Sequence, residues 1–116
     1  MATPAPKAQD TDPFADRRAF PRVEVALPAF LQANGERHSV QILDLSAGGA
    51  KLDSTIAVAV GAAVQLDCGT LARGAVVRWQ DGRIMGICFD AELDHRDVAD
   101  LAQRSTALAA FRKTHE

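Results

Sequence analysis

The segment VEVALPAFLQANGERHSVQILDL, residues 23–45, decides the fold because it reads as two strands joined by a tight turn. Its first half alternates apolar residues along one face: Val23, Val25, Leu27, Ala29 and Leu31. The alternation stops at Asn34-Gly35, a dipeptide that readily adopts the positive backbone dihedral angles of a two-residue hairpin turn. The second half, residues 37–45, alternates again. The segment therefore predicts an antiparallel hairpin with one buried face.

Four more short strands are expected beyond this hairpin. The stretch Ser46-Ala47-Gly48-Gly49 allows a sharp reversal of the backbone, because glycine has no Cβ. Further turn signals occur near Gly69 and at Asp81-Gly82. Alternating apolar patterns predict strands over residues 50–53, 64–68, 71–79 and 83–89. Six short strands joined by hairpins are typical of a small antiparallel barrel, whose closure removes exposed strand edges.

The C-terminal segment has a different period. From Asp94 onward, apolar residues recur at helical spacing, which predicts a helix over residues 94–113 with Asp94 as its N-cap. We therefore expect an all-β fold, a six-stranded antiparallel β-barrel with a C-terminal α-helix packed across an opening. Residues 1–16 contain little that could be buried and are expected to form a flexible leader, which leaves residues 17–116 as the domain.

Composition limits the possible functions. A chain of 116 residues with 47% hydrophobic residues can form one domain with a buried core. Its formal net charge of -2 argues against sequence-blind binding of DNA or RNA, which needs a broadly basic surface. The sequence has no apolar signal region and no stretch of about 18 apolar residues, so no membrane insertion and a cytoplasmic location are expected.

Catalytic and metal-binding patterns are not found in the sequence. The three histidines have no nucleophile paired with them, and neither a phosphate-binding glycine loop nor a metal-ligand spacing occurs. We therefore expect no enzyme activity, no metal and no cofactor. Cys68 and Cys88 each lie in an apolar alternating run and are expected to be buried, reduced thiols.

Two segments carry chemistry suited to a ligand. RRAFPR, residues 17–22, concentrates three guanidinium groups next to a proline that stiffens the backbone. Guanidinium groups bind phosphate or the O6 and N7 edge of guanine. DLSAGG, residues 44–49, offers a carboxylate that can accept hydrogen bonds from guanine, a small hydroxyl, and backbone that can be approached closely. Each segment by itself also has an explanation that involves no ligand. The arginines could simply be charged residues exposed to solvent, and DLSAGG could simply form an Asx-type turn.

Together these segments resemble the PilZ domain family of bacterial receptors for the second messenger cyclic di-GMP. Arg18-Ala19-Phe20-Pro21-Arg22 matches the family's Arg-x3-Arg motif, and Asp44-Leu45-Ser46-Ala47-Gly48-Gly49 matches its Asp/Asn-x-Ser-x2-Gly motif. VVRWQDGRIMGICFD, residues 76–90, is similar to the family's closing strand pair, so the resemblance covers roughly residues 17–112.

The resemblance implies roles for individual residues. Arg18 and Arg22 would contact phosphate and the Hoogsteen edges of guanine. Asp44 and Ser46 would hydrogen-bond a guanine, and Gly49 would allow a sharp turn and close contact with the ligand.

Arg17, Trp79 and Arg78 lie outside the two motifs but near them in the sequence or on the expected barrel. In the family, an arginine just before the first motif accompanies binding of two intercalated ligand molecules, so Arg17 is included in the expected site. Alternatively, Arg17 only neutralises the charge of Asp16. Trp79 is better explained by core or rim packing. Arg78 is expected to face solvent, so neither residue is included in the expected site.

The resulting hypothesis is a cyclic di-GMP receptor that changes conformation on binding and regulates a separate effector protein. Motility, pilus or polysaccharide and biofilm output would each fit the family. The alternative is a PilZ-like interaction adaptor that does not bind nucleotide. A small barrel that binds single-stranded nucleic acid is poorly supported, because that function needs aromatic platforms and the chain has no tyrosine and 1 tryptophan.

Overall fold

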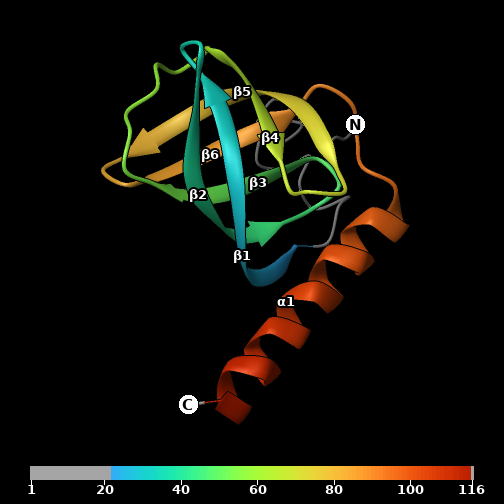
Figure 1. Cartoon of the computed structure of the whole chain (residues 1–116). Helices are drawn as coiled ribbons and strands as arrows, with labels where there is room; N and C mark the ends of the chain where they lie inside the picture. The colour runs from blue at the N-terminus through green and yellow to red at the C-terminus, as the bar shows by residue number, and fades with distance from the viewer. Residues whose placement is uncertain (1–21, 116) are drawn as a thin grey trace, which may run out of the picture.

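The computed structural model describes residues 22–115, with side chains up to residue 111. Six antiparallel strands close into a barrel in the order β1-β2-β3-β6-β5-β4, followed by one helix (Figure 1). The elements are β1 Val23–Ala33, β2 Glu36–Leu45, β3 Gly49–Ser54, β4 Ala63–Asp67, β5 Ala72–Asp81, β6 Ile84–Phe89 and α1 His95–His115. This architecture confirms the predicted fold class. The expected leader, residues 1–16, lies outside the described residues.

The hairpin turns form where the sequence indicates them. Asn34 and Gly35 have φ of 56° and 77°, and Gly82 has φ of 60° between β5 and β6. Gly69, with φ of 95°, turns the chain between β4 and β5. Gly48 and Gly49 are not among the positive-φ glycines, so the reversal between β2 and β3 does not use the left-handed region that favours glycine.

The core fills the inside of the barrel with side chains from all six strands. Fully buried side chains include Leu27, Leu31, Ile42, Leu45, Leu52, Leu66, Val77, Met85 and Ile87. Cys68 is buried as expected, whereas the prediction for Cys88 is wrong because its thiol is exposed. Met85, Ile87 and Phe89 take the inward positions of β6, so the alternation of the strand turns Cys88 outward.

Three strands contain β-bulges, where the pairing register shifts by one residue. The bulges lie between Glu24 and Leu27 in β1, between Ile42 and Asp44 in β2, and between Val77 and Trp79 in β5. A bulge interrupts the in-out alternation of a strand and redirects the following side chain.

Pro28 lies where a residue without an N–H can be accommodated. It pairs with Gln41 of β2, while pairing of β1 with β4 is confined to Phe30, Leu31 and Gln32. Pro28 therefore lies outside the doubly paired part of β1, as its missing donor requires.

Helix α1 begins at an N-cap and packs against β1. The Asp94 carboxylate accepts a hydrogen bond from the Arg96 N–H at 2.9 Å, and Leu101 is buried. The Ser105 hydroxyl accepts the backbone N–H of Ala26 at 2.8 Å, in the half of β1 that has no β4 partner. The last turns project away from the barrel (Figure 1).

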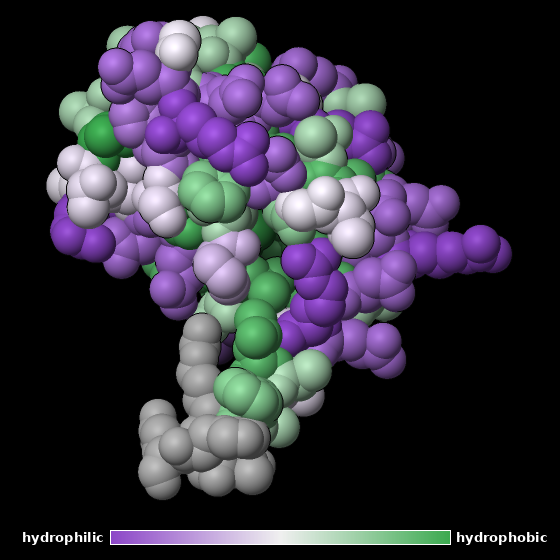
Figure 2. All heavy atoms as spheres, viewed as in Figure 1, coloured by the Kyte–Doolittle hydropathy of each residue, from purple (hydrophilic) through white to green (hydrophobic). Residues whose placement is uncertain are grey.

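Figure 2 shows how the polar and apolar surfaces are divided. Polar side chains cover most of the visible face of the barrel, and apolar ones run along α1 below it. In the described part of the chain, no helix is both long and apolar enough to cross a bilayer.

Candidate ligand-binding site

Five residues form a continuous row across the outside of the barrel. Glu24 of β1 is opposite Asp44 of β2, and Asp44 is opposite Lys51 of β3. Lys51 is opposite Gly86 of β6, and Gly86 is opposite Trp79 of β5. Residues directly opposite on neighbouring strands point to the same face. This set, called the outer row below, therefore presents two carboxylates, an ammonium group and an indole on one surface.

The three bulges all adjoin the outer row. Strict alternation from buried Ile42 would direct Asp44 inward, but Ile42 and Leu45 are both buried, with two residues between them. The bulge thus puts Asp44 on the outer face. The β5 bulge acts in the same way, because it follows buried Val77 and leaves Trp79 outside the core. Bulges occur preferentially beside functional sites, where they redirect side chains.

The charged end of the row is organised around one carboxylate. Nη2 of Arg22, just before β1, donates to both Asp44 oxygens at 3.0 Å. Nζ of Lys51 lies 3.7 Å from Oδ2 of Asp44. The Asp44 side chain is only 13% exposed, against 40% for Arg22 and 39% for Lys51. The carboxylate is thus held in place beneath two cations that reach solvent.

Ser46 shapes the loop between β2 and β3. Its hydroxyl accepts the Gly48 N–H at 3.2 Å and donates to the Gly49 carbonyl at 3.4 Å, while its backbone N–H donates to the same carbonyl at 2.9 Å. The residue is 5% exposed. The carbonyls of Ala47 and Gly48 also accept hydrogen bonds, from the backbone N–H groups of Leu93 and Phe89. In this arrangement Ser46 acts inside a loop that is fixed on both sides.

Gly49 is required by the packing of two strands. A Cβ at this position would overlap the carbonyl oxygen of Ile87 in β6. Gly49 is opposite Cys88, whose exposed thiol therefore lies on the same outer face as Lys51. The glycine allows β3 and β6 to pair closely, which brings the loop motif beside the outer row.

Trp79 covers a glycine at the other end of the row. A Cβ on Gly86 would overlap the indole ring, so the ring lies directly over the β6 backbone. Trp79 is half-buried and is not part of the barrel core. Of the two positions that the sequence allows for Trp79, core or rim, the structure shows rim packing on the outside of the barrel. One face of an indole in this position is suited to stacking on a planar ligand.

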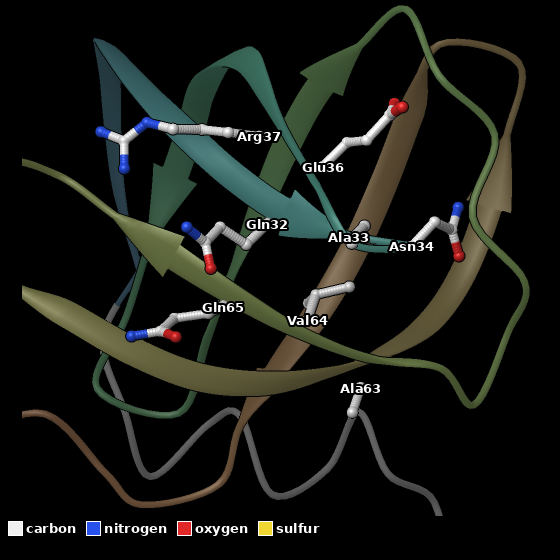
Figure 3. A pocket seen from close by; sticks show the side chains of 9 residues that line it. Gln32, Ala33, Asn34, Glu36, Arg37, Ala63, Val64 and Gln65 are labelled. Carbon is white, nitrogen blue, oxygen red and sulfur yellow. The ribbon is translucent and has the colours of Figure 1, made fainter.

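A separate hollow lies at the far end of the β1–β2 hairpin (Figure 3). Glu36 and Arg37 point away from each other there, and the Gln32 and Gln65 side chains lie side by side on β1 and β4. No set of like groups converges on a common point, and none of the expected site residues lines this hollow. Within the described residues, no group of three or more His, Cys, Asp or Glu residues could hold a metal ion.

The structure thus brings together part of the expected site. Arg22 contacts Asp44 across 22 positions of sequence, and Ser46 and Gly49 form the adjoining loop. Arg17 and Arg18 lie outside the described residues.

Sequence reasoning left out Lys51 and Trp79 as members of this surface. The available signal was the position of Lys51 two residues after Gly49, since residues at this spacing share one face of a strand. Residue spacing along β5 does not indicate that Trp79 faces outward, because the bulge changes the side of the sheet to which its side chain points.

Comparisons with known proteins agree with this architecture. A family model described as the PilZ domain matches residues 16–107. Among solved structures, the chain is similar to the PlzA protein of Borreliella burgdorferi, crystallised in complex with c-di-GMP, with a TM-score of 0.59 and 19% sequence identity. The match covers 85% of this chain and 48% of PlzA, so the chain spans about half the length of that protein. A search of curated proteins finds no match.

Proposed function

Because the chain belongs to the PilZ domain family, we propose that it is a receptor for cyclic di-GMP that binds its ligand on the outer row and the adjoining β2–β3 loop. One observation supports this proposal most strongly. Bulges in β2 and β5 direct Asp44 and Trp79 to the same outer face as Lys51, with Arg22 bound to the carboxylate. A ligand suited to this surface has planar bases, hydrogen-bond donors and negative charge, as guanine nucleotides do.

Each group has a distinct task in the proposed complex. The Asp44 carboxylate accepts hydrogen bonds from the ring N–H and exocyclic amine of a guanine. Arg22 donates to phosphate or to the O6 and N7 edge of a base, which is the geometry that a planar guanidinium favours. Trp79 stacks on a purine ring. Ser46 and Gly49 act mainly by fixing the loop and the β3–β6 spacing next to the ligand.

Arg17 and Arg18 complete the site in this proposal. They precede Arg22 by five and four positions, so they enter the complex on the same chain segment. Arg18 contacts ligand phosphate and the Hoogsteen edge of guanine, and Arg17 serves a second, intercalated ligand molecule. Replacement of Arg17 by alanine is then expected to lower the stoichiometry from two ligands per chain to one, as measured by calorimetry. A wild-type stoichiometry of one would remove this role.

The biological role follows from coupling between binding and conformation. Arg22 lies immediately before β1, so ligand contacts at this arginine restrain the entry of the chain into the barrel. We propose that this changes a surface read by an effector protein, and that the protein acts in the cytoplasm as a regulator without catalytic activity. The two competing functions are an adaptor that does not bind nucleotide and a nucleic-acid binder.

Calorimetric titration of the purified chain with cyclic di-GMP tests the proposal. Removal of a charge-assisted hydrogen bond costs about 1.5–3 kcal/mol, so Arg22→Ala and Asp44→Asn are each expected to weaken binding about 10- to 100-fold. Arg37→Ala is the matched control, because Arg37 forms an ion pair of 3.2 Å with Asp67 at a different place on the barrel. Equal losses in all three variants, or no binding by folded wild-type protein, would refute the proposed function.

A GTP titration and an oligonucleotide titration separate the remaining functions. The receptor is expected to bind neither tightly. An adaptor that does not bind nucleotide would give no heat with any of these ligands. A nucleic-acid binder would instead bind the oligonucleotide with an affinity that falls steeply as salt is raised.

A further inference from the structure

We propose that Lys51 is a binding residue for the phosphate ring of the ligand, placed between one guanine at Asp44 and the other at Trp79. This inference rests on the proposed function and adds to it a specific contact by a residue outside both sequence motifs. Its first support is position. Lys51 is opposite Asp44 on one side and opposite Gly86, the partner of Trp79, on the other.

The chemistry of the row matches the chemistry of a cyclic dinucleotide. Neighbouring strands are about 4.8 Å apart, so the three spacings from Asp44 to Trp79 span about 14 Å. The two ends carry groups suited to a base, a carboxylate and an indole. A cyclic dinucleotide likewise has its bases on the outside and its two phosphates in the central ring. Lys51 lies between these two ends, one strand spacing from Asp44 and two from Trp79, in the part of the span where the ring phosphates would lie.

The ammonium group of Lys51 is available for an anion. Its distance of 3.7 Å from Asp44 exceeds that of an ordinary hydrogen bond, whereas Arg22 donates to the same carboxylate at 3.0 Å. Among residues 22–111, no side chain or backbone group forms a hydrogen bond with this ammonium group. Its side chain is 39% exposed, so a phosphate can reach it.

Among the described residues, no carboxylate is paired with Lys51 alone. Asp44 is shared between Lys51 and Arg22, so one carboxylate serves two cations. Asp53, the next outward-facing carboxylate on β3, is held by Arg83 at 2.9 Å. Glu24, the remaining acid of the outer row, forms no ion pair with Lys51. An ammonium group in such surroundings is a compact point charge suited to phosphate.

Lys51→Met tests this role, because it keeps most of the aliphatic stem and removes the charge. Binding of cyclic di-GMP is expected to weaken about tenfold, and the affinity should become less dependent on salt. Lys51→Arg should restore much of the affinity, since it restores the charge. Arg37→Met is the matched control and should bind like the wild type. Thermal unfolding should show that all variants fold as the wild type does.

A second set of titrations separates direct contact from an effect transmitted through Asp44. In the Asp44→Asn background, Lys51→Met should weaken binding by the same factor as in the wild type if the ammonium contacts phosphate. Disappearance of the effect in that background would show that Lys51 only positions the carboxylate, which overturns the inference. Equal binding by Lys51→Met and wild type also overturns it and leaves the proposed function intact. Failure of the wild type to bind overturns both.

Discussion

Replacement of Gly49 by alanine distinguishes two reasons for the last glycine of DLSAGG. The family resemblance assigns it to a sharp turn and close approach of the ligand, whereas the structure shows that an added Cβ would overlap the carbonyl oxygen of Ile87. A backbone oxygen inside a paired strand cannot rotate away as a side chain can. The β3–β6 pairing must therefore shift, and we expect Gly49→Ala to destabilise the whole domain.

The magnitude follows from two opposing effects. Forcing an extra methyl group into a packed position costs about 1–3 kcal/mol, and a backbone partner favours the upper end of that range. Alanine also restricts the unfolded chain, which returns about 0.4–1 kcal/mol. The net loss of about 2 kcal/mol corresponds to a fall in melting temperature of about 8–16 °C for a domain of this size.

Thermal and urea unfolding measure this loss, and Gly74→Ala provides the control. A Cβ on Gly74 of β5 would meet only the carboxylate end of Asp90, an exposed side chain that can move. The melting temperature of this variant should therefore equal that of the wild type or lie slightly above it. If Gly49→Ala has wild-type stability but has lost ligand binding, the packing explanation is refuted and the glycine serves the ligand directly.

The remaining predictions concern groups on or near the outer row. Gly86→Ala should push the indole of Trp79, the single tryptophan, off β6. The tryptophan fluorescence spectrum should then change, and ligand binding should weaken. An unchanged spectrum would show that the position of the ring does not depend on the glycine. In the folded protein, iodoacetamide should modify exposed Cys88 readily and bound cyclic di-GMP should slow that reaction; equal rates with and without ligand would place the ligand elsewhere. Burial raises the pKa of Cys68, so less of it is thiolate at a given pH, and it should react only at higher pH or after unfolding; rapid reaction of both thiols at pH 8 would contradict this.

Local patterns were sufficient for most of the fold. Turn residues such as Asn34-Gly35 and Asp81-Gly82 fixed where strands end, and two-residue alternation identified which faces are buried. The N-cap at Asp94 was also predictable from the sequence, because capping depends on residues that are neighbours in sequence. These features involve contacts within a few residues, which a sequence displays directly.

Alternation failed where the chain departs from regular pairing. The sequence leaves core and rim packing open for Trp79, and the bulge after Val77 decides for the rim, outside the core. Neither sequence motif contains Lys51, although it lies two residues after Gly49 on the same face. A bulge depends on how two strands pair, and a single strand's sequence does not specify it.

The sequence by itself determined the barrel, its turns, its helix and the two motifs that identify the family, because each depends on local periodicity or on residue types at a fixed spacing. Only the tertiary structure decided which side chains share the outer face. Asp44, Lys51 and Trp79 come from three different strands, and their alignment depends on register and on bulges. A shift of one residue in any of these pairings would reverse the face of a side chain, so the candidate site can form only once the barrel has closed.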